Sequence, residues 1–146
     1  MTAREYLWQL KNIDKRIEDK MEEAQRWRDI AENVTSKVSK DKVQTTPKPD
    51  KMADAIVNAV QYEQESEELA RRLAEFKNKV IHMIDAIDDI RYYDILKMFF
   101  VRNMKIVDIR SSLDRSDRHV RREIDKSIEY FGKMYAEEIE KAEKIR

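Results

Sequence analysis

The stretch "DIRSSLDRSDRHVRREI", residues 108–124, decides how the second half of the chain folds. Ile109 and Leu113 are four residues apart, so they would share one face of a short helix. Val120 and Ile124 repeat that spacing further along. The polar residues between the two pairs are typical of a turn. This stretch therefore predicts two helices joined by a tight turn.

The second of these helices has a clear start. Ser116 can accept a hydrogen bond from a first-turn amide, as N-cap residues do, and Asp117 would then sit at the positive end of the helix dipole. Asp114 and Arg115 would form the turn before it. The buried face of this helix is predicted at steps of 4, 4 and 3, at Val120, Ile124, Ile128 and Phe131.

A strongly apolar helix precedes this pair. "RYYDILKMFFVRN", residues 91–103, is rich in aromatic and aliphatic side chains, which predicts a core helix. Asn103 can adopt the left-handed backbone that ends a helix. The following segment would turn Ile106 inward together with Ile109 and Leu113.

The first half of the chain shows helical spacing from its start. Thr2 and Glu5 match a capping box, in which each side chain binds a backbone amide of the other residue. The apolar positions that follow predict one helix of about 30 residues, roughly 45 Å long. They are Tyr6, Leu10, Ile13, Ile17, Met21, Ala24, Trp27, Ala31 and Val34.

Residues 35–50 break this spacing and predict a flexible loop, because both prolines fall there among several Ser and Thr residues. Helical spacing then resumes for about 38 residues. Two long helices joined by a loop most simply form an antiparallel, coiled-coil-like hairpin. The predicted fold is therefore all-α, with a helical hairpin at residues 1–90 followed by a compact helix-turn-helix domain at residues 91–146.

The composition agrees with long helices and excludes several kinds of site. The chain of 146 residues has one glycine, two prolines, no cysteine and 41% charged residues, which is typical of solvated helices with few turns. Without cysteine there is no disulfide or thiolate metal site, and the two histidines show no metal-ligand spacing. We predict no catalytic set, no cofactor and no metal, and we do not expect an enzyme.

Neither a secretory signal nor a membrane span is predicted. The opening "MTAREYLWQL" lacks a long apolar run, and no stretch approaches the 18 or so apolar residues that a span needs. We therefore expect a cytoplasmic protein without a membrane partner.

The formal net charge is zero, but the charges are unevenly distributed. Residues 91–126 hold ten basic and six acidic residues, a net charge of +4, whereas residues 1–90 have −3 and residues 127–146 have −1. The basic segment contains the predicted helix-turn-helix, which favours an acidic partner.

A short helix, a tight turn and a capped helix with several arginines form the helix-turn-helix pattern. Residues 91–131 resemble region four of the bacterial sigma-70 factors. They are more similar still to small phage-encoded proteins with such a domain, related to the RinA- and ArpU-type late transcription regulators. That family opens similarly to "MTAREYL", continues as a charged hairpin, and begins its recognition helix with "S-E-R-x-V". The matching residues here are Ile95, Leu96, Phe100, Asp108, Ile109, Ser116, Asp117, Arg118 and Val120.

Two positions depart from that family. Its members usually have glycine in the turn, where this chain has Asp114, and an aromatic residue at the start of the second helix, where this chain has Ile106. Aspartate tolerates the left-handed backbone, so the turn is expected to survive.

The predicted DNA-contact residues lie around the start of the third helix. An arginine there can hold guanine O6 and N7 together, and Arg115 and Lys105 are better placed for phosphates. Asp117 is unfavourable near phosphates and could instead orient a neighbouring arginine. The alternative is that the arginines form only a solvated helix face. The predicted set is Lys105, Arg115, Ser116, Asp117, Arg118, His119, Arg121 and Arg122.

These residues and the resemblance imply a phage or prophage transcription regulator that binds double-stranded DNA in the cytoplasm of a bacterial host. The hairpin would support homo-oligomerisation or contact host RNA polymerase. Two alternatives stay open. One is a small-terminase-like DNA-packaging subunit that assembles as a ring. The other is a protein-binding module that contacts RNA polymerase without sequence-specific DNA binding.

Overall fold

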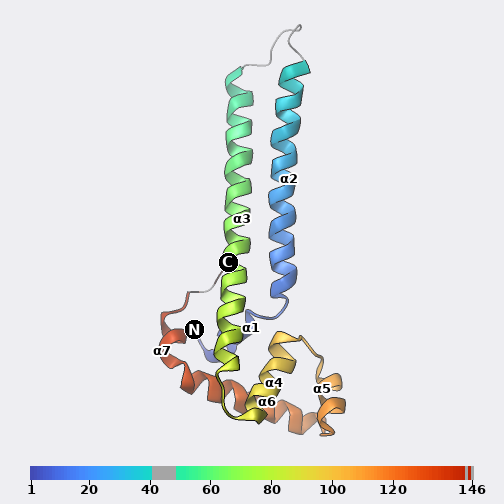
Figure 1. Cartoon of the computed structure of the whole chain (residues 1–146), viewed down its shortest axis with the longest axis vertical. Helices are drawn as coiled ribbons and strands as arrows, with labels where there is room; N and C mark the ends of the chain where they lie inside the picture. The colour runs from blue at the N-terminus through green and yellow to red at the C-terminus, as the bar shows by residue number, and fades with distance from the viewer. Residues whose placement is uncertain (41–48, 144, 146) are drawn as a thin grey trace. The chain divides into compact units, whose positions relative to one another are not determined.

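A computed structural model shows the chain as a set of helices (Figure 1). The structure describes residues 1–40, 49–143 and 145, with the side chains of residues 1–34, 51–143 and 145. No β-strand occurs within those residues, so the prediction of an all-α fold is confirmed. The elements are α1 (Ala3–Trp8), α2 (Ile13–Lys40), α3 (Pro49–Asp85), α4 (Ile90–Leu96), the π-helix η1 (Lys97–Val101), α5 (Ile106–Leu113), α6 (Asp117–Met134) and α7 (Ala136–Lys141).

The chain divides into two compact units. The hairpin unit is Asp14–Ala74, and the globular unit combines Met1–Ile13 with Glu75–Arg146. This division differs from the predicted one at residue 90, because α1 packs against α6 and α7 rather than continuing the hairpin. The last turns of α3 also belong to the globular unit.

The first predicted helix is interrupted. α1 ends at Trp8, the backbone then turns, and α2 begins at Ile13 after Asn12, whose φ is 60°. The predicted continuous helix is therefore wrong at this point. Leu10 and Ile13 are both buried, so the apolar spacing runs across the turn and hides it. The predicted capping box is confirmed: the Thr2 hydroxyl accepts from the Glu5 amide at 3.1 Å, and the Glu5 carboxylate accepts from the Thr2 amide at 2.9 Å.

Within the hairpin unit, α2 and α3 pack as an antiparallel pair, which confirms the predicted pairing of two long helices (Figure 1). The Trp27 and Tyr62 rings lie 4.8 Å apart between centroids. The guanidinium group of Arg28 lies 2.8 Å from Glu63 and 2.9 Å from Glu67. The buried residues of this unit are Ala24, Ala59, Ser66, Ala70 and Leu73.

The seam on α2 differs from the predicted stripe at one position. Met21 was predicted to lie in the stripe, but 61% of its surface is exposed. Lys20 is half-buried instead and bonds to Glu23 at 2.8 Å. A lysine can cover apolar surface with its methylene chain while its ammonium group stays in contact with water or a carboxylate.

The predicted loop is shorter than expected on its N-terminal side. α2 continues to Lys40 and α3 begins at Pro49, so residues 35–40 are helical. Pro49 suits the first position of a helix, where no amide donor is needed. The rest of the predicted loop, residues 41–48, lies outside the described residues.

The core of the globular unit gathers side chains from both ends of the chain. The Tyr6 ring lies 5.2 Å from that of Phe76 and 6.1 Å from that of Phe131. The Tyr6 hydroxyl donates to the Met83 sulfur at 3.6 Å, and burial raises the pKa of this tyrosine. The predicted core positions that prove to be buried are Ile95, Leu96, Phe100, Ile109, Val120, Ile124, Ile128 and Phe131.

Gly132 sets the distance between α1 and α6. A Cβ atom at this position would lie 2.9 Å from the Cβ of Ala3. In an open helix, replacing glycine by alanine stabilises the fold. Here we expect Gly132→Ala to lower the free energy of unfolding by about 1–2 kcal/mol, because the two backbones must move apart. Urea denaturation of the full chain followed by circular dichroism measures this change.

The matched control for Gly132→Ala is the double variant with Ala3→Gly. Removing the Ala3 Cβ makes room for the new methyl group, so the double variant should recover stability beyond the sum of the two single changes. Additive effects, or a stabilised Gly132→Ala variant, would contradict the close approach.

Candidate nucleic-acid interface

The turn between α5 and α6 has the backbone that a helix-turn-helix needs. Asp114 follows α5 in the left-handed conformation, with φ and ψ both 51°, and its amide donates to the Arg110 carbonyl. The Arg115 amide bonds to the same carbonyl at 3.2 Å. Aspartate thus takes the place expected for glycine without loss of the turn, and Asn103 likewise has the predicted left-handed backbone, with a φ of 52°.

Ser116 caps α6 as predicted. Its hydroxyl accepts from the His119 amide at 3.2 Å. Asp117 lies in the first turn, where a carboxylate is stabilised by the helix dipole. This carboxylate also accepts from Arg121 Nε at 2.8 Å, which confirms that Asp117 orients a neighbouring arginine.

The predicted contact residues fall into two places. The predicted residues from Arg115 to Arg122 lie in the turn and the first two turns of α6, whereas Lys105 precedes α5 at the opposite end of that helix. An eight-residue helix is about 12 Å long, so Lys105 is separated from the others by that length of helix. Asp117 and His119 are half-buried. The exposed members of the set are Lys105, Arg115, Ser116, Arg118, Arg121 and Arg122.

A π-helix, which the apolar spacing does not predict, precedes α5. At the end of η1, the Arg102 amide donates to the carbonyl of Lys97, five residues earlier, at 2.8 Å. The Met104 amide donates to the carbonyl of Met98 at 2.9 Å. A π-helix has one extra residue per turn. Phe99 lies in the last turn of η1, where helix carbonyls have no donor within the helix. The apolar spacing contains no signal for this insertion.

Lys11 satisfies the carbonyl that this π-helix exposes. Its ammonium group donates to the Phe99 carbonyl and lies 3.5 Å from the centroid of the Phe99 ring. Burial lowers the pKa of Lys11. Trp8 packs edge-on against Phe99 and Phe100. The turn after α1 therefore holds the segment that positions α5.

A second charged group holds η1 from the end of α3. Lys97 pairs with Asp85 at 2.7 Å, and its ammonium group also lies 5.7 Å from the centroid of the Tyr93 ring. Asp85, at the end of α3, and Lys11, in the turn after α1, thus contact the π-helix from two different elements. Both contacts are distant in sequence, so neither could be read from local spacing.

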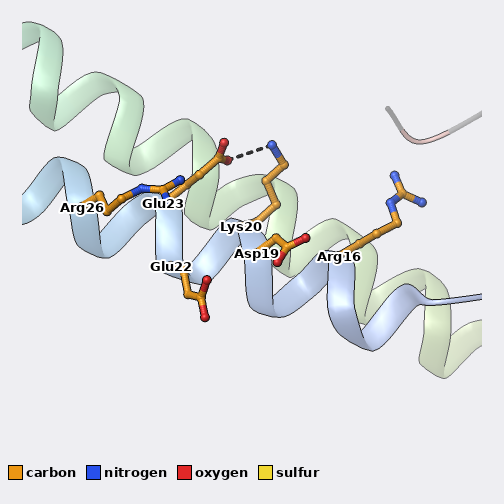
Figure 2. Close-up of a pocket in the computed structure, with 6 residues that line it drawn as sticks. All are labelled: Arg16, Asp19, Lys20, Glu22, Glu23 and Arg26. Carbon is orange, nitrogen blue, oxygen red and sulfur yellow. Dashed lines mark hydrogen bonds and ion pairs between the residues drawn. The ribbon is translucent and has the colours of Figure 1, made fainter.

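A charged surface on α2 of the hairpin unit is shown in Figure 2. All six side chains that line it come from one helix and carry both signs of charge, and Lys20 pairs there with Glu23 at 2.8 Å. A mixed, open surface of this kind favours no particular ligand. The lining residues are Arg16, Asp19, Lys20, Glu22, Glu23 and Arg26.

The described part of the chain offers neither a metal site nor a membrane span. Among its residues, no group of three or more His, Asp or Glu side chains lies close enough to hold a metal ion. No helix in that part of the chain combines the length and the apolar character needed to cross a membrane.

Comparison with known proteins gives no relative. No protein-family model matches the chain, and no curated protein and no solved structure is similar to it. The resemblance to sigma region four therefore stays a prediction carried by the residues themselves.

Lys11→Met tests whether this lysine holds the π-helix. We expect the free energy of unfolding to fall by about 1–2 kcal/mol, because the Phe99 carbonyl loses its donor and the ring loses its cation. Urea denaturation measures the loss. Lys15→Met removes the same charge from an exposed position of α2 and should change stability by less than about 0.5 kcal/mol. Equal losses in the two variants would refute the role of Lys11.

Proposed function

We propose that the chain is a DNA-binding transcription regulator of phage or prophage origin, acting in the cytoplasm of a bacterial host. The observation that carries this proposal is the start of α6: a capped helix with exposed arginines on its first two turns and a buried face behind them. A recognition helix enters the major groove by this end. The short α5 and the tight turn at Asp114 supply the rest of the motif.

The charge distribution supports the same proposed function. The basic segment at residues 91–126, with a net charge of +4, contains the whole motif, and phosphate contacts by basic side chains supply much of the affinity for DNA. Asp117 would oppose phosphates by itself, but its ion pair with Arg121 offsets that charge. The chain's overall neutrality predicts modest non-specific binding.

The resemblance to sigma region four adds a protein partner to the proposal. Host RNA polymerase is the partner that such a domain implies, and the hairpin unit offers a long charged surface for it. A protein-binding module that contacts RNA polymerase without reading DNA is the alternative. Salt-sensitive, sequence-selective DNA binding separates these two functions.

The hairpin unit also supports self-association. Several large apolar side chains of α2 and α3 are exposed in the described chain, and Val57 and Val60 lie one turn apart on α3, where a second copy could cover them. A single helix-turn-helix reads few base pairs, so a dimer would reach two half-sites. A ring of many copies would instead favour the small-terminase-like packaging subunit. The exposed residues are Met21, Ile30, Val57, Val60 and Tyr62.

DNA binding is tested with duplexes of random central sequence at two salt concentrations. We expect the wild type to enrich one motif and to bind more weakly at higher salt, since phosphate contacts release counterions. The triple variant Arg118→Ala/Arg121→Ala/Arg122→Ala should select no motif. The slope of its log affinity against log salt concentration should fall by up to about three.

The matched control removes three positive charges from exposed positions of the hairpin unit: Lys15→Ala/Arg26→Ala/Arg72→Ala. It should keep the motif. Sequence recognition by α6 is excluded if the wild type selects no motif at either salt concentration. It is also excluded if both triple variants bind and select DNA alike.

Self-association is tested by sedimentation velocity of the full chain, whose monomer mass is 17.6 kDa. Val57→Glu/Val60→Glu places two charges on the exposed apolar face of α3 and should shift the mass towards the monomer. Asn58→Glu/Gln61→Glu adds the same charges about 100° round the helix and should leave the mass unchanged. A monomeric wild type would rule out the dimer, and a mass of many copies would favour the ring.

A further inference from the structure

Two arginines occupy the outer face of α6. Arg118 and Arg122 are each two positions from buried Val120, and Arg122 is also two positions from buried Ile124. Since successive residues turn by about 100° round an α-helix, two positions amount to about 200°, so both side chains leave the helix opposite the core. Both are exposed, and within the described residues neither has an ion-pair partner.

The third arginine of this helix lies on its flank. Arg121 directly follows Val120, about 100° round the helix from that buried side chain. Its Nε donates to Asp117 Oδ2 at 2.8 Å, one turn earlier. The ion pair uses one donor of the guanidinium group and fixes its direction, while the terminal nitrogens remain able to donate elsewhere. Arg121 is therefore held at the edge of the face that Arg118 and Arg122 occupy.

Beyond the second turn of α6, the carboxylates of the outer face are paired with basic side chains. Asp125 follows Arg122 and pairs with Arg4 of α1 at 2.5 Å. Glu129, one turn further on, pairs with Lys133 at 3.1 Å. Each of these carboxylates offsets the charge of its basic partner, whereas Arg118 and Arg122 keep their full positive charge for a DNA duplex.

We propose that Arg118 and Arg122 each read one guanine, while the Asp117–Arg121 pair contacts the sugar-phosphate backbone. This assignment rests on the proposed function. An outward arginine presents the two-pronged donor that matches guanine O6 and N7. Four residues of helix rise about 6 Å, against about 3.4 Å for each base-pair step. The two guanines therefore lie within two base-pair steps of each other.

Asp117 is a positioning residue in this assignment. Its carboxylate aims Arg121 but also lowers the attraction of the flank for phosphates. Asp117→Asn keeps an oxygen that can accept from Arg121 and removes the negative charge. This variant should bind all duplexes more tightly, with the selected motif unchanged and with a steeper salt dependence.

The test selects binding sequences with the full-length wild type and with single variants, and then titrates each protein on the selected site and on an unselected duplex. Arg118→Ala and Arg122→Ala should each erase the preference at one guanine and weaken binding to the selected site roughly 5- to 150-fold. Arg121→Ala should weaken binding to both duplexes equally and leave the selected motif unchanged.

Two further sets of variants separate charge from recognition. Arg118→Lys and Arg122→Lys keep the charge but lack the planar fork, so they should lose the guanine preference and retain the salt dependence. Lys126→Ala, in the third turn and 4.0 Å from Glu123, is the matched control and should keep the motif. The unfolding midpoint of every variant checks that α6 is intact. If an alanine variant unfolds, the lysine variants still test whether each arginine recognises a guanine.

The outcomes distinguish this assignment from the proposed function. A wild type that selects no motif overturns both. A wild-type motif that survives Arg118→Lys and Arg122→Lys, or that is erased by Arg121→Ala, overturns the assignment of bases and leaves DNA binding in place. A motif without two guanines within two steps also overturns the assignment.

Discussion

The packing of α1 against α6 is the constraint on which the globular unit depends. Tyr6 lies between Phe76 and Phe131, and Gly132 lets the backbone of α1 approach α6 at Ala3. The helix that carries the candidate recognition surface is thus supported on its buried side by the first residues of the chain. This close approach explains why the first 13 residues group with the C-terminal half rather than with the hairpin.

The π-helix η1 connects the turn after α1 with the helix-turn-helix, since it contacts that turn and precedes α5. It leads directly towards α5, and the Phe99 carbonyl in its last turn would be costly to leave without a donor. Lys11, in the turn that follows α1, supplies the donor, and Lys97 anchors η1 to Asp85. The turn that interrupts the first helix therefore has a structural purpose: it brings a lysine to the segment that orients α5.

The charges on α6 are ordered along the helix rather than spread evenly. Arg118 and Arg122 occupy the outer face of the first two turns, Asp117 holds Arg121 on the flank, and the carboxylates of the following turns are paired with basic side chains. A polyanion that meets the N-terminal end of this helix would therefore contact arginines whose charge is not offset by a carboxylate.

The sequence by itself determined the features that depend on neighbouring residues. The caps at Thr2 and Ser116, the left-handed residues Asn103 and Asp114, and the buried face of α6 all follow from interactions within four or five positions. Only the tertiary structure decided the break before Asn12, the π-helix and the exposure of Met21. The break and the π-helix depend on contacts between Lys11 and Phe99 and between Asp85 and Lys97, which the apolar spacing does not record. The orientation of Arg121 depends on both. Its partner Asp117 is only one turn away in the sequence, but its position on the flank depends on which face of α6 is buried in the core.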